Sequence, residues 1–333
     1  MKICVVGAGA IGGMLGVKLA LSGHEVTLIL RGANLQAVQE NGLVLIEESG
    51  NELLAKPIKA TSNIAEVGAQ DVVILGLKAH QVAAVAPDLP ALMHSATRVV
   101  TMQNGIPWWY FQKLPGAYTA MPVRAVDPDG VIAQHIPIDS VIGSVVYPAS
   151  EVIRPGVIKV IEGNRFTLGE IDGSDTPSIR AISDAFKAAG FKAPVSTDIR
   201  SEIWLKVWGN LSFNPISALT HAMLEDICTY GPTRELAANM MTEAQAIGEK
   251  LGVQFKVSLE KRIAGAQAVG QHKTSMLQDV EQGRVLELQA LVASVIELGQ
   301  VTGTPTPTIH AVYALASLLA KNLQLRGATL KIS

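Results

Sequence analysis

The feature that most constrains this chain is a glycine-rich turn, VVGAGAIGGML, which spans residues 5–15 and joins a short apolar run to a helical pattern. Gly7, Gly9 and Gly12 have the spacing G-x-G-x-x-G. In a dinucleotide-binding fold the first glycine permits a sharp turn, the second lets a pyrophosphate approach the backbone, and the third lets the helix pack against the strand. A tight turn without a ligand is the alternative explanation.

The surroundings of this motif favour the dinucleotide interpretation. The turn follows a β-rich run and opens a helical pattern, so it lies within a β-α-β sequence. The N-terminus of such a helix offers free N–H groups and a partial positive charge to a phosphate. We therefore predict that a dinucleotide is bound by six consecutive residues, Gly7, Ala8, Gly9, Ala10, Ile11 and Gly12.

The first half of the chain alternates strand and helix patterns. Apolar β-rich runs occupy residues 2–8, 25–31, 71–78 and 96–105. The run at 71–78 is almost continuously apolar, which is typical of a strand buried on both faces of a parallel sheet. The pattern predicts an α/β fold with a Rossmann-like, doubly wound sheet. The helix after the glycine turn should present four apolar residues, Met14, Leu15, Leu19 and Leu21.

The pattern changes twice further along the chain. Short strands with Gly and Pro punctuation fill residues 120–173, and we expect them to extend the same sheet in a mixed or antiparallel manner. A helix and then a strand are expected in residues 178–196. Later residues have only helical periodicity. Because 333 residues suffice for two cores, we predict a Rossmann-like cofactor domain at residues 1–197 and an all-α substrate and catalytic domain at residues 198–333.

Composition excludes several classes of protein. Hydrophobic residues make up 48% of the chain and charged residues 17%, which is typical of a globular protein. With a net charge of -2 and no basic block, we expect no nucleic-acid partner. No apolar stretch could cross a bilayer and no signal peptide is recognisable, so we expect a cytoplasmic protein without a membrane partner. The two cysteines, Cys4 and Cys228, are too few for a zinc site, and we expect no metal.

The end of the second strand bears on the choice of cofactor. A fold that binds NAD usually has an acidic residue there, which binds the 2′-hydroxyl of the ribose. This strand ends at Arg31, and no acid stands beside it. A guanidinium suits a 2′-phosphate because its planar fork can bind two oxygens. A solvated surface arginine is the alternative, but the missing acid favours NADP (NADPH).

Two polar residues follow later strands of the same predicted sheet. Lys78 closes the third strand and Asn104 closes the fourth. Ligands of such sheets bind beyond the carboxyl ends of the strands. Lys78 could instead be a surface charge at a helix start, and Asn-Gly is a common turn. Together, on strands that follow a dinucleotide motif, the two residues are predicted to face the nicotinamide and its ribose.

The most informative helical pattern is EIWLKVWGNLSFNPISAL, which is apolar on most sides. Lys206, Asn210 and Asn214 recur on it at i, i+4 and i+8, which places them in one row. Unpaired buried polar groups cost about 1–3 kcal/mol each, so the row must face partners, water or a ligand. A core polar network is the alternative to a substrate cleft. Ser275 and Glu287, the latter expected on a helix and partly buried, are predicted to form the opposite wall.

With these motifs the chain resembles the ketopantoate reductases (2-dehydropantoate 2-reductases) over nearly its whole length. The resemblance is carried by VVGAGAIGG, by LK at Lys78 and by QNG at Asn104. It is carried more specifically by KVWGNLSFNPISALT and HKTSMLQDVEQGRVLEL. It implies an NADP-dependent oxidoreductase that reduces ketopantoate to (R)-pantoate, on the route to pantothenate and coenzyme A.

The resemblance also implies a role for each candidate residue. The glycine loop would hold NADPH, Arg31 would meet its 2′-phosphate, and Lys78 and Asn104 would lie near the nicotinamide. Lys206 would be the catalytic acid, and Glu287 would complete the site. Binding of the 2-keto acid substrate is implied for three residues, Asn210, Asn214 and Ser275.

Three positions depart from the family pattern and leave the substrate open. Family members often carry Asn at the position of His272 and near Leu224, and some carry Asp at the position of Gln289. A reductase of another branched 2-keto acid is therefore an alternative. A redox sensor that binds NADPH without turnover is a second alternative, although a sensor needs no proton donor such as Lys206. The sequence leaves open a homodimer and the role of the aromatic run at residues 108–111.

Overall fold

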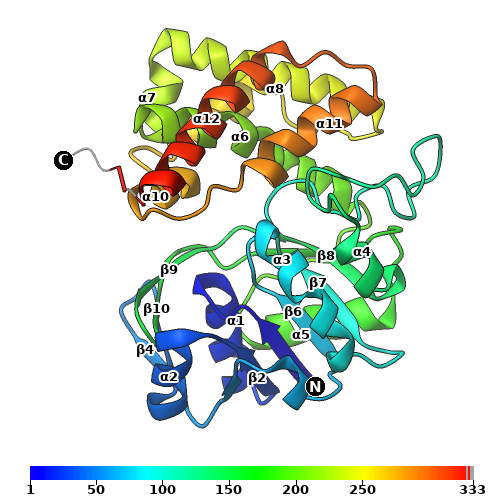
Figure 1. Cartoon of the computed structure of the whole chain (residues 1–333), viewed down its shortest axis with the longest axis vertical. Coiled ribbons are helices and arrows are strands. Elements are labelled where there is room, and N and C mark those ends of the chain that lie inside the picture. The colour runs from blue at the N-terminus through cyan, green and yellow to red at the C-terminus, as the bar shows by residue number, and fades with distance from the viewer. Residues whose placement is uncertain (328, 331–333) are drawn as a thin grey trace. The chain divides into compact units, whose positions relative to one another are not determined.

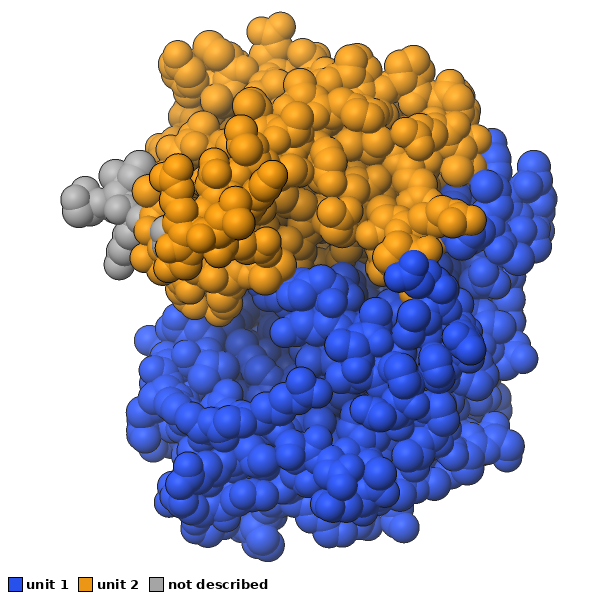
Figure 2. All heavy atoms as spheres, in the orientation of Figure 1, with its two compact units in different colours: residues 1–103, 108–122, 129–199 blue, residues 104–107, 123–128, 200–333 orange. Residues whose placement is uncertain are grey.

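The structure of the protein is a computed structural model that describes residues 1–327, 329 and 330. The chain divides into two compact units, coloured blue and orange in Figure 2. Unit 1 comprises residues 1–103, 108–122 and 129–199, and unit 2 comprises residues 104–107, 123–128 and 200–333. The sequence predicts one boundary, between residues 197 and 198. In the structure, two short segments of the first half also group with the helical unit.

Unit 1 is built on a seven-stranded sheet with the strand order β11-β8-β7-β6-β1-β2-β5. Its strands are β1 (Lys2–Val6), β2 (Glu25–Ile29), β5 (Lys59–Thr61), β6 (Val72–Leu75), β7 (Arg98–Thr101), β8 (Val141–Val146) and β11 (Phe166–Glu170). All neighbours are parallel except β11, which pairs antiparallel with β8. This α/β architecture, visible in the lower half of Figure 1, confirms the predicted doubly wound sheet.

The register of the central strands brings the loops of interest to one edge of the sheet. Val6, at the end of β1, lies opposite Ile29 on β2 and Leu75 on β6. The N–H of Gly7 then donates to the Ile29 carbonyl at 3.2 Å. Because these strands are parallel, the loops after β1, β2 and β6 all leave the sheet at the same edge.

A second, four-stranded sheet corrects one expectation. The strands β9 (Ala149–Arg154) and β10 (Val157–Glu162) do not extend the main sheet; they join β3 (Leu43–Ile46) and β4 (Glu52–Ala55) in the order β4-β3-β10-β9. In β10 the residues Val157, Ile158 and Val160 are buried, and Ile158 packs so closely on the first helix that a Cβ on Gly13 would lie 2.1 Å from it. The strand expected before residue 196 is reduced to two isolated bridges, at Lys192 and Val195.

Helices cover the sheets of unit 1. They are α1 (Ala10–Leu21), α2 (Gly32–Asn41), α3 (Ala79–Val85), α4 (Val131–His135) and α5 (Pro177–Ala188), with 3-10 turns at Ile64–Glu66, Ala86–Leu92 and Ile138–Ser140. Met14, Leu15 and Leu19 of α1 are buried as expected. Leu21 is 51% exposed, because it is the last residue of the helix and lies beyond the sheet-facing turns.

The aromatic run at residues 108–111 groups with unit 1. Trp108, Trp109, Tyr110 and Phe111 are all buried. The Trp109 indole N–H donates to the Thr101 hydroxyl at 3.0 Å, and the Tyr110 and Phe111 rings meet edge to face at 5.1 Å. The run therefore fixes the chain just beyond β7 by packing.

Unit 2 is helical; within its described residues no strand is present. Its helices are α6 (Ile199–Thr220), α7 (Leu224–Thr229), α8 (Gly231–Lys250), α9 (Leu259–Ala268), α10 (Ser275–Glu281), a π-helical turn (Gln289–Ala293), α11 (Ser294–Val301) and α12 (Pro307–Arg326). Trp208 of α6 anchors the core, since its ring lies 4.7 Å from Phe255 and its N–H donates to the Met241 carbonyl at 2.7 Å. Among the described residues no helix is long and apolar enough to cross a membrane.

Carboxylates hold two connections within unit 2. Glu243 on α8 accepts the backbone N–H groups of Thr308 and Ile309, at 2.8 and 3.0 Å, and so binds the first turn of α12. Glu297 on α11 accepts hydrogen bonds from the backbone N–H groups of Arg124 and Ala125, at 2.8 and 2.7 Å. The second pair fixes residues 123–128 to the helical unit, although this segment lies far from it in the sequence.

Candidate active site

The glycine loop of unit 1 has the geometry of a phosphate cradle. Gly7 has a φ of +89°, which a side chain would strain, and a Cβ on Gly12 would lie 2.3 Å from the Gly7 carbonyl oxygen. These two glycines are thus required by the fold itself. Gly9 differs, because a Cβ there would meet nothing within 4 Å. The protein does not need its bare backbone, whereas a close ligand would.

The N-terminus of α1 is also left open for a ligand. Gly9 is its N-cap and offers no side-chain hydrogen bond, and the first turn carries no acidic residue. The first N–H groups of such a helix, with their partial positive charge, can bind a phosphate. The residues present therefore fit a dinucleotide, and their binding role stays a prediction.

Arg31 and Lys78 lie at the same edge of the sheet as this loop. Arg31 is the N-cap of α2, two residues after the end of β2, and is exposed. Lys78 is the N-cap of α3, three residues after the end of β6, and is half-buried. No acidic residue lies between β2 and α2. The arrangement suits an anionic cofactor whose ribose end meets Arg31.

Gln103 is a structural residue near the site that the sequence pattern does not indicate. Its side-chain amide donates to the carbonyls of Leu75 and Leu77, at 2.8 and 3.0 Å. It thereby fixes the short connection from β6 to Lys78. The signal was a polar residue next to Asn104 at the end of an apolar strand, but its partners lie 26 and 28 residues away in the sequence.

Lys206 forms the centre of the candidate site in unit 2. It projects from α6, a helix whose tryptophans at 204 and 208 are completely buried. Its ammonium donates a 2.5 Å hydrogen bond to Oδ1 of Asn104. Asn104 groups with unit 2, and its predicted place at the nicotinamide with Lys78 stays a prediction.

Two opposing effects act on the pKa of Lys206. Burial disfavours the charged ammonium and lowers the pKa from 10.5 to about 8, while the negative charge of Glu287 acts against this and raises it. Burial is the larger effect. The result is a lysine that is mostly protonated at neutral pH yet can release its proton readily, which suits a general acid.

Glu287 has the expected partial burial but not the expected secondary structure. It lies in the irregular segment after α10, just before a helical stretch that begins at Leu288. Gly283, with a φ of +63°, ends α10, and the Arg284 guanidinium then bonds back to Asp279 at 2.8 Å. The apolar pattern around Glu287 therefore spans a loop and a helix start. Its carbonyl accepts the N–H of Leu291 at 3.1 Å, so it acts as the cap of the next helix.

Asn210 and Asn214 continue the polar row on α6. Asn210 is half-buried, and no hydrogen bond to its side chain is present among the described residues. Asn214 is buried, and its amide nitrogen lies 3.5 Å from the hydroxyl of Ser275, which is the exposed first residue of α10. The structure thus brings Asn214 and Ser275 together, with an amide and a hydroxyl available to a polar ligand.

The positions that depart from the family pattern have defined surroundings. The N–H of Leu224 donates to the His272 carbonyl at 3.1 Å, so these two positions are neighbours in space. Gln289 is exposed and bonds to the Tyr313 hydroxyl at 3.3 Å. The paired departures at 224 and 272 therefore change one local surface of unit 2.

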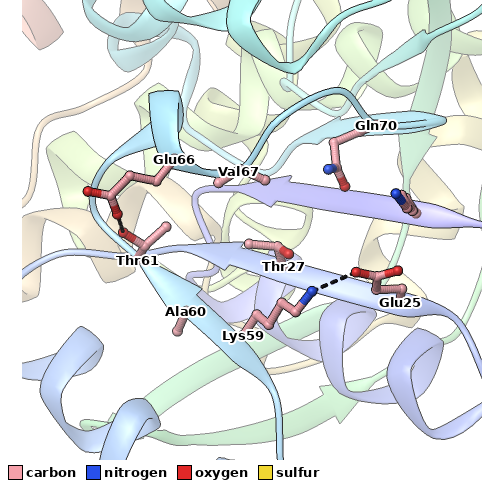
Figure 3. Close-up of a pocket in the computed structure, with 9 residues that line it drawn as sticks. Glu25, Thr27, Lys59, Ala60, Thr61, Glu66, Val67 and Gln70 are labelled. Carbon is pink, nitrogen blue, oxygen red and sulfur yellow. Dashed lines mark hydrogen bonds and ion pairs between the residues drawn. The ribbon is translucent and has the colours of Figure 1, made fainter.

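An open pocket of about 330 Å³ on unit 1 lies elsewhere (Figure 3). It is bordered by strands β2 and β5 and by the segment before β6. Lys59 and Glu25 pair across it at 2.6 Å, and Glu66 accepts from Asn63 at 2.8 Å. No residue predicted for the site lines this pocket, and we assign it no ligand.

The fold and these residues define a two-part protein of the Rossmann-like oxidoreductase class, with a sheet unit followed by a helical unit. Two family models match it. The model of ketopantoate reductase PanE/ApbA matches residues 3–173, and the model of the C-terminal part of the same enzyme matches residues 198–320. The chain belongs to the ketopantoate reductase family, which confirms the resemblance seen in the sequence.

Individual relatives agree with this assignment. A 2-dehydropantoate 2-reductase of Mesorhizobium japonicum is 53% identical over 321 residues, which cover 96% of this chain and 98% of that protein. A crystal structure from Ralstonia solanacearum, provisionally assigned as a ketopantoate reductase, has 41% identity and a TM-score of 0.92, covering 97% of this chain and 98% of the other. D-mandelate dehydrogenase in complex with NADH and anilino(oxo)acetate, at 22% identity and a TM-score of 0.82 over 97% of this chain and 100% of the other, shares the fold.

The glycine loop generates a prediction with an internal control. Gly9→Ala should weaken dinucleotide binding about tenfold or more, because a methyl group that overlaps a phosphate costs on the order of 1–3 kcal/mol. Gly12→Ala should instead lower the free energy of unfolding of the cofactor-free protein by a similar amount, since its Cβ would collide with Gly7. Fluorescence titration and urea unfolding separate the two effects. If Gly9→Ala bound the dinucleotide normally, the cradle would be misassigned.

Proposed function

We propose that the protein catalyses the NADPH-dependent reduction of 2-dehydropantoate (ketopantoate) to (R)-pantoate, with Lys206 as the general acid. The observation that carries the proposal is the desolvated ammonium of Lys206, hydrogen-bonded to Asn104 in a helical unit that also presents two further amides. Membership of the ketopantoate reductase family and the name of the 53% identical relative support this substrate.

The reaction is a hydride transfer coupled to a proton transfer. NADPH, held by the glycine loop with Arg31 and Lys78, would supply a hydride to the keto carbon of the substrate. The electron pair of the C=O π bond moves to the oxygen, and Lys206 donates a proton there as the negative charge develops. The neutral amine then regains a proton from water. One keto acid, one NADPH and one proton therefore give one hydroxy acid and one NADP⁺.

The other polar residues of unit 2 bind the substrate. Asn210 and Asn214 orient it from the same row of α6, and Ser275 binds its carboxylate end with a hydroxyl beside Asn214. Glu287 keeps a negative charge near Lys206, which favours the protonated state that reduction requires. Asn104 accepts a hydrogen bond from the Lys206 ammonium and so fixes the direction of one N–H bond of that ammonium.

The choice of NADPH over NADH rests on Arg31 at the carboxyl end of β2 and on the absence of an acid between β2 and α2. A 2′-phosphate would give the guanidinium a doubly charged partner, whereas an uncharged ribose hydroxyl would not. Lys78, at the same edge of the sheet, would lie beside the nicotinamide half of the cofactor.

A different branched 2-keto acid is the second candidate substrate. It is favoured by the adjacent departures at Leu224 and His272, which place an apolar and an imidazole side chain where amides are common in the family. An assay of NADPH oxidation with a panel of 2-keto acids decides between them. If kcat/KM is highest for ketopantoate, the proposal is supported. If kcat/KM is clearly higher for another keto acid, that compound replaces ketopantoate as the substrate. No turnover with any member of the panel would favour an NADPH sensor.

Cofactor preference gives the first test of this function. The unaltered protein should prefer NADPH, and Arg31→Ala should raise the KM for NADPH about ten- to a hundredfold, since a charge-assisted contact contributes roughly 1.5–3 kcal/mol. The KM for NADH should change little. Arg180→Ala, which removes an equal charge from α5, is the matched control. Equal use of both cofactors by the unaltered protein would rule out this role for Arg31.

Removal of the acid gives the second test. Lys206→Ala should lower kcat about 10²–10⁴-fold and leave NADPH affinity unchanged, because a positioned acid acts in the transition state. Lys206→Arg should also be slow, since guanidinium does not release its proton at accessible pH. Lys250→Ala, which removes another lysine of unit 2, should be near normal. Steady-state kinetics and fluorescence titration provide both readouts.

The pH dependence has a definite sign. Reduction needs protonated Lys206, so kcat/KM for the keto acid should fall as pH rises through about 8. The reverse oxidation needs the neutral amine and should gain activity over the same range. An Ala variant that kept a near-normal kcat, or the same alkaline limb, would exclude Lys206 as the acid.

A further inference from the structure

The helical stretch that follows Glu287 contains a local distortion. Residues Gln289–Ala293 form a π-helical turn before α11 begins. In an α-helix the N–H of Ser294 would bond to the carbonyl of Ala290; here it bonds to the carbonyl of Gln289. The Ala290 carbonyl is therefore released from its α-helical partner and can accept other donors. Such π turns are rare and occur frequently at functional sites.

The released carbonyl binds a segment from far away in the sequence. It accepts the N–H of Ile106 at 2.9 Å and the hydroxyl of Ser294 at 2.6 Å. Gly105, with a φ of +98°, lies directly against it, because a Cβ there would be 2.1 Å from the Ala290 oxygen. The backbone at Gly105 thus packs on the π turn with no room for a side chain.

The residue before Gly105 is Asn104, whose Oδ1 accepts the hydrogen bond of Lys206. A continuous set of contacts therefore runs from the Ala290 carbonyl, through two residues of backbone, to the Lys206 ammonium. The same helical stretch begins beside Glu287, whose charge also acts on Lys206. All these residues belong to unit 2.

We propose that the π turn is a positioning device for Lys206: its Ala290 carbonyl fixes the backbone at Gly105 and Ile106 and so holds the Asn104 amide that orients the ammonium. This inference rests on the proposed role of Lys206 as the acid. Gly105 and Ala290 are positioning residues, since their link to the reacting atoms runs through Asn104 and Lys206.

A physical need for such a device follows from the length of the lysine side chain. Four rotatable bonds allow the ammonium many positions, and a fixed acceptor reduces their number. A displacement of about 1 Å at a reacting group can reduce a rate on the order of a hundredfold. The acceptor also stabilises the charged form, so its loss should lower the pKa of Lys206 further.

The primary experiment compares two glycine substitutions. Gly105→Ala should lower kcat about ten- to a hundredfold and move the alkaline limb of kcat/KM to lower pH, with NADPH affinity unchanged. Gly252→Ala is the matched control, because Gly252 also has a positive φ, +84°, but nothing lies within 4 Å of its added Cβ. Circular dichroism and urea unfolding establish that both variants fold. The control should keep the wild-type kcat and pH profile.

A double-mutant cycle tests whether the effect passes through Asn104. Asn104→Ala should move the pH limb in the same direction as Gly105→Ala, and the double variant should move it no further than Asn104→Ala alone. Should Gly105→Ala fail to fold, Ser294→Ala replaces it. That variant removes the second donor to the Ala290 carbonyl without adding an atom, and it should move the limb the same way by a smaller amount.

The outcomes separate this inference from the proposed function. Suppose that Lys206→Ala abolishes reduction while a folded Gly105→Ala keeps the wild-type alkaline limb of kcat/KM. The positioning role of the π turn is then wrong, and Lys206 remains the general acid. Additive shifts in the double variant, or an equal loss in Gly252→Ala, would also overturn it, as would an unmoved limb in Ser294→Ala. If Lys206→Ala is active, the acid assignment fails and this inference falls with it.

Discussion

The helical unit must keep the buried ammonium group of Lys206 charged. Removing Lys206 from water lowers its pKa, and an isolated ammonium in that place would lose its proton. The negative charge of Glu287 opposes this loss, and the ammonium donates a hydrogen bond to the amide oxygen of Asn104. The balance leaves the pKa at about 8. An acid with this value holds its proton near neutral pH and donates it more readily than an exposed lysine would.

The segment at the end of β7 connects this balance to the rest of the chain. Gln103 binds carbonyls at the end of β6, and the next residue, Asn104, binds Lys206. Consecutive side chains therefore serve two different structures, the sheet that carries the glycine loop and the helix that carries the lysine. Buried aromatic packing at residues 108–111 secures the chain just beyond them. A change in the β7 loop should thus be felt at Lys206 although it leaves α6 untouched.

The sequence predicts those features that depend on local pattern. Apolar runs with glycine punctuation indicated the doubly wound sheet, and the i, i+4, i+8 spacing indicated the polar row of α6. Pairings between distant segments were not predicted. Nothing local shows that β10 pairs with β3 in a second sheet, or that Asn104 meets a lysine 102 residues later. The π turn contacts Gly105 and Ile106, which lie far away in the sequence. The helical pattern around residues 285–298 therefore showed neither this distortion nor the loop that precedes it at Glu287.

The central claim is that Lys206 is a buried, charge-balanced acid, and its titration tests this most directly. The protein labelled with ¹³C at lysine Cε can be followed by NMR from pH 6 to 11, with the Lys206→Ala variant identifying the resonance. The account predicts that this one resonance titrates near pH 8, well below the ordinary lysine value of 10.5. A Lys206 resonance that titrates at or above 10.5 would contradict it.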